Sequence, residues 1–197
     1  MINLIKNKKD YLHYIECDRI ALSRNKRTII SCFKSWIIKD EVWKFQRALR
    51  KYEYAKNCRK GVLSNFYWVI TKLRYNRLSI KLGFAIPPNV FGAGLAIAHS
   101  GTIVVNGGAK IGRNCRLNVG VNIGTKAGGD ISAPTIGDNV YIGPGAKLFG
   151  DIIIADGIAI GANAVVNKSF EDTNITIAGV PARKISDKGS EGLLIIT

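Results

Sequence analysis

An aliphatic or aromatic residue followed by a small or polar one returns every six residues through most of the second half of the chain. A period of six fits neither an α-helix, at about 3.6 residues per turn, nor a single flat strand, at about 2. Each six must therefore form a short straight segment and a corner, and successive segments must stack into a coil. The inward anchors are Phe91, Ile97, Val105, Ile111, Leu117, Ile123, Ile136, Ile142, Leu148, Ile154, Ile160 and Val166. The repeat predicts a parallel β-helix.

Two interruptions break this repeat. Two extra residues, Ile103 and Val104, stand between neighbouring anchors, so we expect the coil to bulge directly after His99. A longer excursion, the external loop 125–135, leaves the coil and returns at Ile136. Loops that leave a rigid scaffold commonly carry function, so both interruptions are candidate sites.

Charge divides the chain into unlike halves. The 197 residues are 47% hydrophobic and 22% charged, an ordinary globular composition, with a net charge of +15. Residues 1–83 hold 20 Lys and Arg against 6 Asp and Glu, whereas the remainder holds 9 against 8. We therefore predict a basic α-helical N-terminal domain over 1–83, a β-helix domain over 84–171, and a C-terminal cap and tail over 172–197.

Helix signals occur at three places in the basic half. Asp10, Asp40 and Ser64 each precede apolar residues at helical spacing. Asp40 and Ser64 are plausible N-caps, because their side-chain oxygens can accept from the free N–H groups of a first turn. Pro87 and Pro88 cannot continue a helix and mark the change to extended structure.

Several classes of protein are disfavoured by the composition. No apolar stretch after Met1 is long enough for a signal peptide or a membrane span, so we expect a cytoplasmic protein, with peripheral contact at the inner membrane face as a further expectation. Cys17, Cys32, Cys58 and Cys115 form no Cys-x-x-Cys pair, so we predict reduced thiols and no metal. A zinc hydratase of the carbonic anhydrase type needs several histidine ligands, and the repeat contains one histidine.

Four motifs carry a resemblance to a known family. They are Ile97-Ala98-His99-Ser100-Gly101-Thr102, the loop ending Gly128-Gly129-Asp130, Gly143-Pro144-Gly145-Ala146-Lys147, and Ala178-Gly179-Val180-Pro181-Ala182-Arg183. In order and spacing they resemble the hexapeptide-repeat acyltransferases, and most of all the serine acetyltransferases and their relatives from surface-polysaccharide gene clusters. The resemblance covers roughly residues 84 to 190. It implies a left-handed coil, a homotrimer, and acetyl-CoA as co-substrate, although no nucleotide-binding signature is visible.

His99 is the residue that we predict as general base. It is the only histidine of the repeat region, and it stands two places past an inward anchor, where the side chain should point outward. Acyl transfer from a thioester to a hydroxyl needs a base, and imidazole, with an ordinary pKa of about 6.5, suits that role at neutral pH. The resembling family pairs this histidine with an aspartate, but the matching positions here are Phe84 and Ala85. A backbone carbonyl could fix the tautomer instead.

The resemblance also implies binding residues. Small corner residues would let the pantetheine arm approach the backbone, although glycines also serve tight corners alone. The predicted cofactor-binding residues are Gly124, Thr125, Lys126, Gly143, Gly161, Ala162, Lys168, Arg183 and Lys184. The predicted acceptor-binding residues are Asn106, Asn122, Asp130 and Ser132.

The acceptor is predicted from two departures from the family pattern. Serine acetyltransferases have an Asp directly before the catalytic His and an Arg-His pair after the Gly-Gly-Asp, whereas this chain has Ala98 and Ile131-Ser132. Leaving both charged ends of serine unpaired in a closed site would cost ~1–3 kcal/mol for each group, and more for charges. We therefore predict a sugar hydroxyl in capsule or surface polysaccharide as the acceptor. Serine O-acetylation in cysteine biosynthesis is the alternative.

The basic half suggests a further partner. Its concentrated positive charge predicts contact of residues 1–83 with an anionic membrane or an acidic glycan. The plainer interpretation is a solvated helix surface with trimer contacts. A non-enzymatic trimeric module that binds a polyanion is the third functional alternative, although no nucleic-acid signature is visible.

Overall fold

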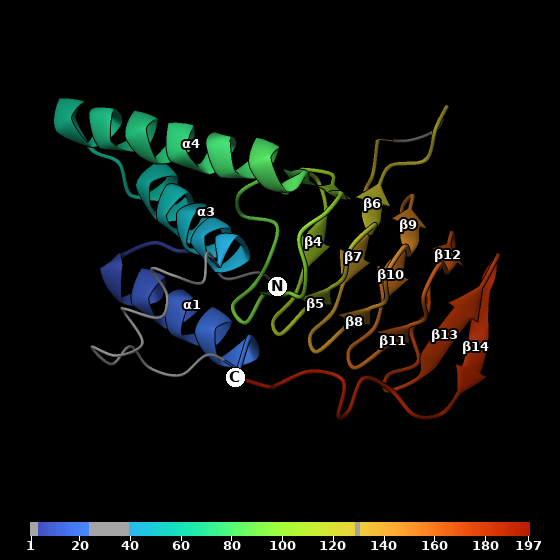
Figure 1. Cartoon of the computed structure of the whole chain (residues 1–197). Helices are drawn as coiled ribbons and strands as arrows, with labels where there is room; N and C mark the ends of the chain where they lie inside the picture. Colours follow the sequence, from blue (N-terminus) through green and yellow to red (C-terminus); the bar gives the residue numbers. More distant parts are fainter. Residues whose placement is uncertain (1–3, 24–39, 129–130) are drawn as a thin grey trace.

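The computed structural model describes residues 4–23, 40–128 and 131–197. In these ranges a group of helices lies against one end of a coil of short strands (Figure 1). The helices are α1 (Lys8–Ala21), α3 (Glu41–Asn57) and α4 (Val62–Leu82). Gly83, in the left-handed region at φ 73°, ends α4, and the first strand follows it directly. The last helix therefore leads into the coil without a linker.

Side-chain chemistry explains one helix start and corrects another. Asp40 caps α3, because its Oδ1 accepts from the N–H of Trp43 at 3.0 Å, as predicted. The predicted cap at Ser64 is wrong. Helix α4 begins at Val62 after Gly61, and the Ser64 hydroxyl instead donates to the Gly61 carbonyl at 2.8 Å.

The described strands form three sheets, here named A, B and C, and each middle turn of the coil places one strand in each, whereas the first and last turns meet sheet B only through single bridges at Phe91 and Phe170. Sheet A contains β1 (Phe84–Ala85), β3 (Ile103–Val105), β6 (Asn122–Gly124), β9 (Lys147–Phe149) and β12 (Val165–Val166). Sheet B contains β4 (Lys110–Ile111), β7 (Thr135–Ile136) and β10 (Ile153–Ile154). Sheet C contains β2 (Ala96–Ile97), β5 (Arg116–Leu117), β8 (Tyr141–Ile142), β11 (Ala159–Ile160), β13 (Thr176–Gly179) and β14 (Ala182–Ser186). The strand pairs are parallel except β13 with β14, which is antiparallel.

The core of the coil is the predicted row of anchors. Every anchor is buried, at 3% exposure or less. In sheet C, Leu117 pairs with Ile142, and Ile142 pairs with Ile160, so the inward side chains stack from coil to coil. The prediction of a six-residue β-helix is confirmed. The stack also extends past the last predicted anchor, because the fully buried Ile177 pairs with Ile160.

The C-terminal segment covers the coil end and then returns along its side. Strand β14 pairs with β13 in the opposite direction and closes the parallel sheet. The tail beyond it runs back toward the helices (Figure 1), where the Thr197 hydroxyl donates to Asn114 Oδ1 at 2.7 Å. Such covers protect a solenoid end, whose open strand edge would otherwise be exposed.

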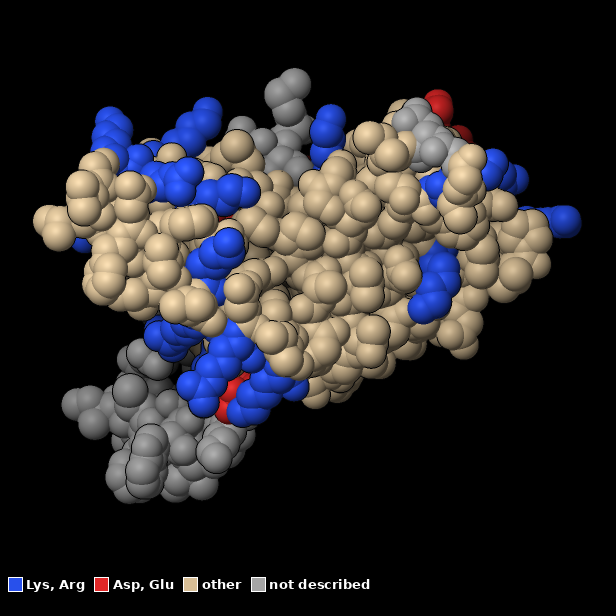
Figure 2. Space-filling view, turned by 90° about the horizontal axis from the view of Figure 1, so that it is seen from above, with Lys and Arg blue, Asp and Glu red and all other residues tan. Residues whose placement is uncertain are grey.

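The helical part carries an unusual surface. Lys and Arg gather over it in Figure 2, and α4 contains neither Asp nor Glu. Its outer side is nonetheless largely apolar, with exposed Val62, Leu63, Phe66, Leu73 and Ile80. No helix within the described ranges has both the length and the apolar character needed to cross a bilayer.

Candidate functional site

His99 lies on the edge of the coil where sheet C turns into sheet A. It follows β2 in an exposed bend. Ile97 pairs with Leu117, and Val104 pairs with Asn122, so the corner that contains His99 is two residues longer than the corner of the next coil. The predicted bulge after His99 is confirmed. It leaves the imidazole on the outside of the coil.

The corner is fixed by a glycine and by the end of α4. Gly101 has φ 131°, and a Cβ there would lie 2.4 Å from Val119 Cγ2. Its N–H donates to the Leu82 carbonyl at 3.1 Å, and the N–H of Ile103 donates to the Gly83 carbonyl at 3.1 Å. The backbone that follows His99 is therefore bound to the last residues of the helix.

Within the described ranges, the His99 imidazole has neither a hydrogen bond nor an ion pair. Phe84, at the position where a carboxylate was sought, is buried, and Ala85 is exposed beside Val104 on sheet A. The carbonyl partner suggested for Nδ1 is likewise not seen among the described residues. The tautomer of His99 is not set by contacts within this part of the chain.

Three of the predicted cofactor residues share the edge of His99. Gly143, Gly161 and Ala162 occupy the corners of later coils between the same two sheets, and backbone hydrogen bonds join successive corners. A Cβ at Gly143 would lie 2.7 Å from the Ile160 carbonyl oxygen, and one at Gly161 would lie 2.8 Å from a side chain of β13. Tight stacking of the coils accounts for both glycines, so they leave no space that a ligand would fill.

The other corner residues lie on the next edge, between sheets A and B. Gly124 ends β6, Thr125 and Lys126 follow it, and Lys168 follows β12. Both lysines are exposed. The strands β6 and β12 are two steps apart in sheet A, about 10 Å at the usual strand spacing. Two exposed cations on one edge suit the separated phosphates of a nucleotide.

The predicted acceptor residues are dispersed. Asn106 uses its Oδ1 to accept from the N–H of Gly108 at 2.8 Å, which stabilises a turn. Asn122 is exposed on the outer face of sheet A, between the two edges, and Ser132 is half-buried where the external loop returns. Asp130 lies outside the described residues.

Arg183 and Lys184 both belong to β14, at the far end of sheet C. Lys184 is already paired, with Nζ 2.6 Å from Asp187 and 3.8 Å from Asp172. The hydrogen bond with Asp187 raises the pKa of Lys184. Arg183 is exposed. Within one chain, the predicted cofactor-binding residues are thus distributed over two edges and one end strand.

Lys147 is a candidate that the sequence analysis missed. It stands on the outer face of sheet A next to Asn122, and its ammonium donates to the carbonyl of Gly120. Gly120 donates in turn to the Thr102 carbonyl at 2.8 Å, in the corner of His99. The Lys147 ammonium is therefore held at the edge of the coil that carries His99. The sequence contains a signal for this position. If the six-residue repeats are aligned coil on coil, Lys147 falls beside Asn122, as the structure shows.

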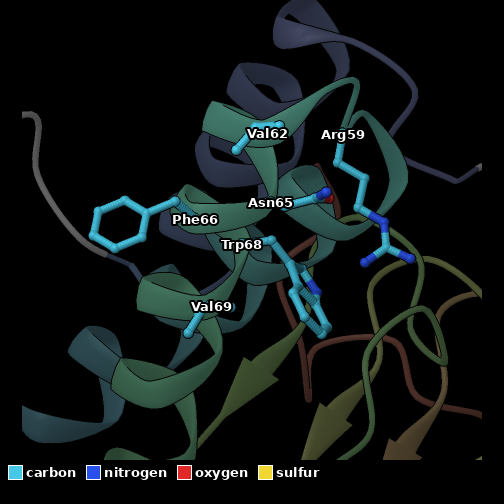
Figure 3. Close-up of a pocket in the computed structure, with 6 residues that line it drawn as sticks. All are labelled: Arg59, Val62, Asn65, Phe66, Trp68 and Val69. Atoms are coloured by element: carbon cyan, nitrogen blue, oxygen red, sulfur yellow. The ribbon is translucent and has the colours of Figure 1, made fainter.

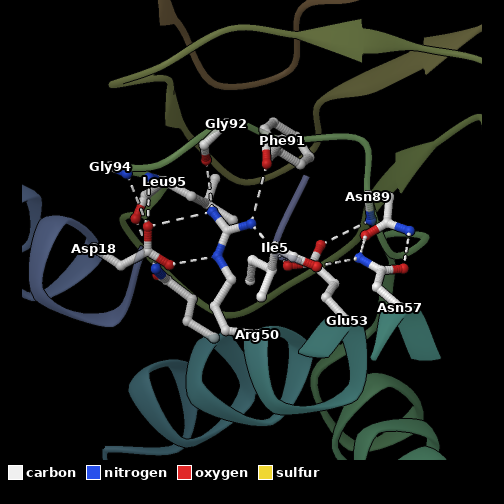
Figure 4. A network of polar contacts seen from close by, with 11 residues as sticks. Ile5, Asp18, Arg50, Glu53, Asn57, Asn89, Phe91, Gly92, Gly94 and Leu95 are labelled. Atoms are coloured by element: carbon white, nitrogen blue, oxygen red, sulfur yellow. Dashed lines mark hydrogen bonds and ion pairs between the residues drawn. The ribbon is translucent and has the colours of Figure 1, made fainter. Parts of the chain in front are cut away.

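A second missed feature is a buried group of charges where the helices meet the first coil (Figure 4). Arg50, fully buried, donates to Asp18 Oδ2 at 2.8 Å and to Glu53 Oε2 at 3.0 Å. It also donates to the carbonyls of Phe91 and Gly92, at 3.0 and 2.7 Å. The guanidinium thus joins two helices to the start of the coil.

Asp18 binds the same stretch from its other side. Its Oδ1 accepts from the N–H groups of Gly94 and Leu95, each at 2.9 Å. Burial raises the pKa of the Asp18 carboxyl, and the Arg50 guanidinium opposes that shift. No sequence signal links these residues, because they lie far apart along the chain and follow no repeat.

Other groups with potential chemistry lie away from this edge. A shallow depression on the N-terminal half of α4 is lined by Arg59, Val62, Asn65, Phe66, Trp68 and Val69 (Figure 3). Cys115 is buried inside the coil, and burial raises the pKa of its thiol. Among the described residues, no group of three or more His, Cys, Asp or Glu could hold a metal ion.

Comparisons with known proteins agree on one group of transferases. The family model described as bacterial transferase hexapeptide (six repeats) matches residues 133–168. A serine acetyltransferase of Staphylococcus xylosus is 30% identical over 191 residues, which cover 96% of this chain and 81% of that relative. One from Synechococcus elongatus is 32% identical over 61% of this chain, which spans half (50%) of that relative's length.

A solved structure agrees with these relatives. The serine acetyltransferase of Brucella abortus in complex with coenzyme A has a TM-score of 0.65 and is 25% identical, covering 92% of this chain and 68% of that one. Together with the helices and parallel strands, the similarity confirms the predicted fold class, a left-handed β-helix of hexapeptide repeats after a helical N-terminal segment.

The prediction of a sugar acceptor is wrong. The relatives named above are serine acetyltransferases, and they support the alternative rather than polysaccharide acetylation. That prediction requires a closed site in which the charged ends of serine stay unpaired. His99 is instead exposed at the edge of the coil, and Lys147 presents an ammonium at the same edge that can pair with one of those charges.

Proposed function

Because this chain belongs to the serine acetyltransferase family of hexapeptide-repeat transferases, we propose that it transfers an acetyl group from acetyl-CoA to the hydroxyl of L-serine. The similarity to the Staphylococcus xylosus protein, which extends along nearly the whole chain, carries this proposal. The exposed His99 at the edge of the coil supports it chemically.

His99 is the proposed general base. A ring nitrogen takes the proton of the serine hydroxyl as the oxygen attacks the thioester carbonyl. The carbon–sulfur bond then breaks, the acetyl group stays on the serine oxygen, and the coenzyme leaves as the thiol after it regains a proton. The exposure of the ring and the longer corner in which it stands support this role.

The exposed cations are the proposed ligands of the acetyl-CoA phosphates. Lys126 and Lys168 share one edge, and Arg183 is exposed on the end strand, whereas Lys184 is held in ion pairs. When bound, acetyl-CoA supplies the activated acyl group. The complex of the Brucella abortus relative with coenzyme A supports this choice of co-substrate.

The activity is tested by thiol release. Purified protein is incubated with acetyl-CoA, with and without L-serine, and free CoA is measured. His99→Ala should lower kcat about 10²–10⁴-fold, the usual effect of general-base removal. His13→Ala is the matched control, since His13 is exposed on α1, and it should keep full activity. Serine-dependent release that survives His99→Ala would refute the assigned base, and no release by the wild type would refute the function.

Lys147 is the proposed partner of the serine carboxylate. Its ammonium lies at the edge of His99, held by the Gly120 carbonyl. Lys147→Gln should raise the KM for serine about 10- to 150-fold and leave the KM for acetyl-CoA unchanged, because a hydrogen bond to a charged group contributes about 1.5–3 kcal/mol. Lys110→Gln, exposed on sheet B, is the control. An unchanged KM for serine would remove Lys147 from the site.

A homotrimer is the proposed assembly. The exposed apolar side of α4, with Phe66 at 68% and Leu73 at 62% exposure, supports burial against other copies. Among the described residues, none orients the His99 ring. In a trimer, a residue of a neighbouring subunit could do so. Light scattering should give three times the 21.5 kDa chain mass, and a monomer at micromolar concentration would refute this assembly.

Contact of the helical part with an anionic membrane remains a further proposal. Lys and Arg gather on the helical part (Figure 2), and α4 contains neither Asp nor Glu, so this surface would attract anionic lipid. Co-sedimentation with liposomes tests it. Equal binding to neutral and anionic vesicles, or no binding, would exclude this contact.

A further inference from the structure

The first strand of sheet C lies at the sheet edge, and a side chain takes the place of its missing neighbour. Strand β2 pairs with β5 on one side only. On the other side, Gln46 of α3 donates from Nε2 to the Leu95 carbonyl at 2.6 Å and accepts at Oε1 from the N–H of Ile97 at 3.1 Å. A parallel strand neighbour would bond the backbone in the same donor and acceptor pattern. Gln46 is fully buried, at 0% exposure, so water cannot replace these bonds.

This pairing ends two residues before His99. On the coil side, the N–H of Ala98 donates to the Leu117 carbonyl at 3.0 Å. The backbone is thus bound from both sides up to Ile97 and from the coil side up to Ala98, the residue before His99. The described residues offer the ring itself no hydrogen bond, so its position depends on this stretch and on the corner that follows.

Two other polar side chains of the helices hydrogen-bond to backbone groups that precede Leu95 or Ile97 in the same coil. Asp18 holds the N–H groups of Gly94 and Leu95, and Arg50 holds the Phe91 and Gly92 carbonyls. Gln46 is therefore the last helical side chain in this series before His99 along the chain.

We propose that Gln46 is a positioning residue, whose amide fixes the backbone before His99 and so directs the imidazole toward the substrate hydroxyl. The proposal rests on the proposed function, because it assigns Gln46 a role in that reaction. Gln46 does not touch substrate in this account. A misplacement of a reacting group by about 1 Å can cost 10²-fold in rate.

The test compares Gln46→Met, which keeps the side-chain length and removes both bonds, with Thr71→Val. Thr71 is also buried and polar, at 4% exposure, but its hydroxyl bonds within α4 to the Trp68 carbonyl. Gln46→Met should lower kcat about 10- to 100-fold with the KM for acetyl-CoA within about twofold. Thr71→Val should leave kcat unchanged. If Gln46→Met melts earlier but keeps the wild-type kcat per folded protein, Gln46 only stabilises the fold and the proposal is overturned.

A second variant covers the case in which Gln46→Met does not fold. Gln46→Asn retains an amide that is one methylene too short to reach both Leu95 and Ile97, so its kcat must also fall. An unchanged kcat in that variant overturns the proposal.

Hydrogen exchange separates this inference from the proposed function. The amide of Ile97 should exchange faster in the Gln46 variants than in Thr71→Val, whether or not the protein acetylates serine. If the wild type shows no transfer, the proposed function fails on its own. If the wild type is active and the Ile97 amide stays protected in the variants, the positioning role is overturned.

Discussion

The coil and the helical end of this molecule are stabilised in opposite ways. Inside the coil, Ile, Val and Leu side chains stack in register, and the backbone groups of each strand bond to the coil above and below. At the helical end, the buried contacts include a guanidinium, two carboxylates and an amide, from Arg50, Asp18, Glu53 and Gln46. The same protein thus combines an apolar core with a buried charged one.

The difference follows from where the backbone N–H and C=O groups of each region find their hydrogen-bond partners. A coil in the middle of the stack finds its hydrogen-bond partners in identical neighbours, and its side chains need only fill space. The first coil has a neighbour on one side, so buried backbone groups on the other side would remain unpaired, at a cost of ~1–3 kcal/mol each. Polar side chains of α1 and α3 satisfy these groups. His99 lies immediately after the stretch that they hold.

The largest effect is expected at the charged end. Arg50→Met would leave Asp18 and Glu53 buried without their counter-ion, so the free energy of unfolding should fall by about 3–5 kcal/mol. Urea denaturation followed by circular dichroism measures it. Arg74→Met, exposed on α4, is the control and should change little. A loss below about 1 kcal/mol at Arg50 would show that the charged core contributes no more than a surface pair.

A smaller effect is expected at the corner that joins the two regions. Gly101→Ala introduces a Cβ 2.4 Å from Val119 Cγ2 at φ 131°, so stability should fall by about 1–3 kcal/mol and acetyl transfer should decrease. Gly128→Ala is the control, because Gly128 also has a positive φ, 68°, but nothing lies within 4 Å of its Cβ position. Equal losses in both variants would assign the effect to backbone conformation and not to crowding beside His99.

The smallest effect is expected within the coil. Ile142→Val removes one buried methylene from a stack of similar side chains, so the free energy of unfolding should fall by about 0.5–1.5 kcal/mol. Ile153→Val, at a position 51% exposed, is the matched control and should stay within about 0.5 kcal/mol of wild type. A loss at Ile142 as large as that at Arg50 would remove the distinction between the two regions.

The candidate site could be predicted only in part. The two extra residues after Ile97 predicted the longer corner, because an insertion into a strict six-residue repeat can be recognised in the amino-acid sequence. The cap at Asp40 was also readable, since its partner lies three residues away. The N-cap of α4 could not be predicted, because it is Gly61, which has no side-chain oxygen, and Ser64 lies inside the helix. Lys147 was overlooked because its place beside the corner of His99 depends on the register between coils.

The sequence by itself determined the coil, because each six-residue unit carries its own inward side chain and its own corner, and the repeat makes every unit fit the next. Only the tertiary structure decided how the first coil is closed. Gln46 and Leu95 meet across a separation of 49 residues, and Asp18 and Leu95 across 77. Such contacts follow no period, and they exist because buried backbone groups at the end of a stack must find partners from another part of the chain.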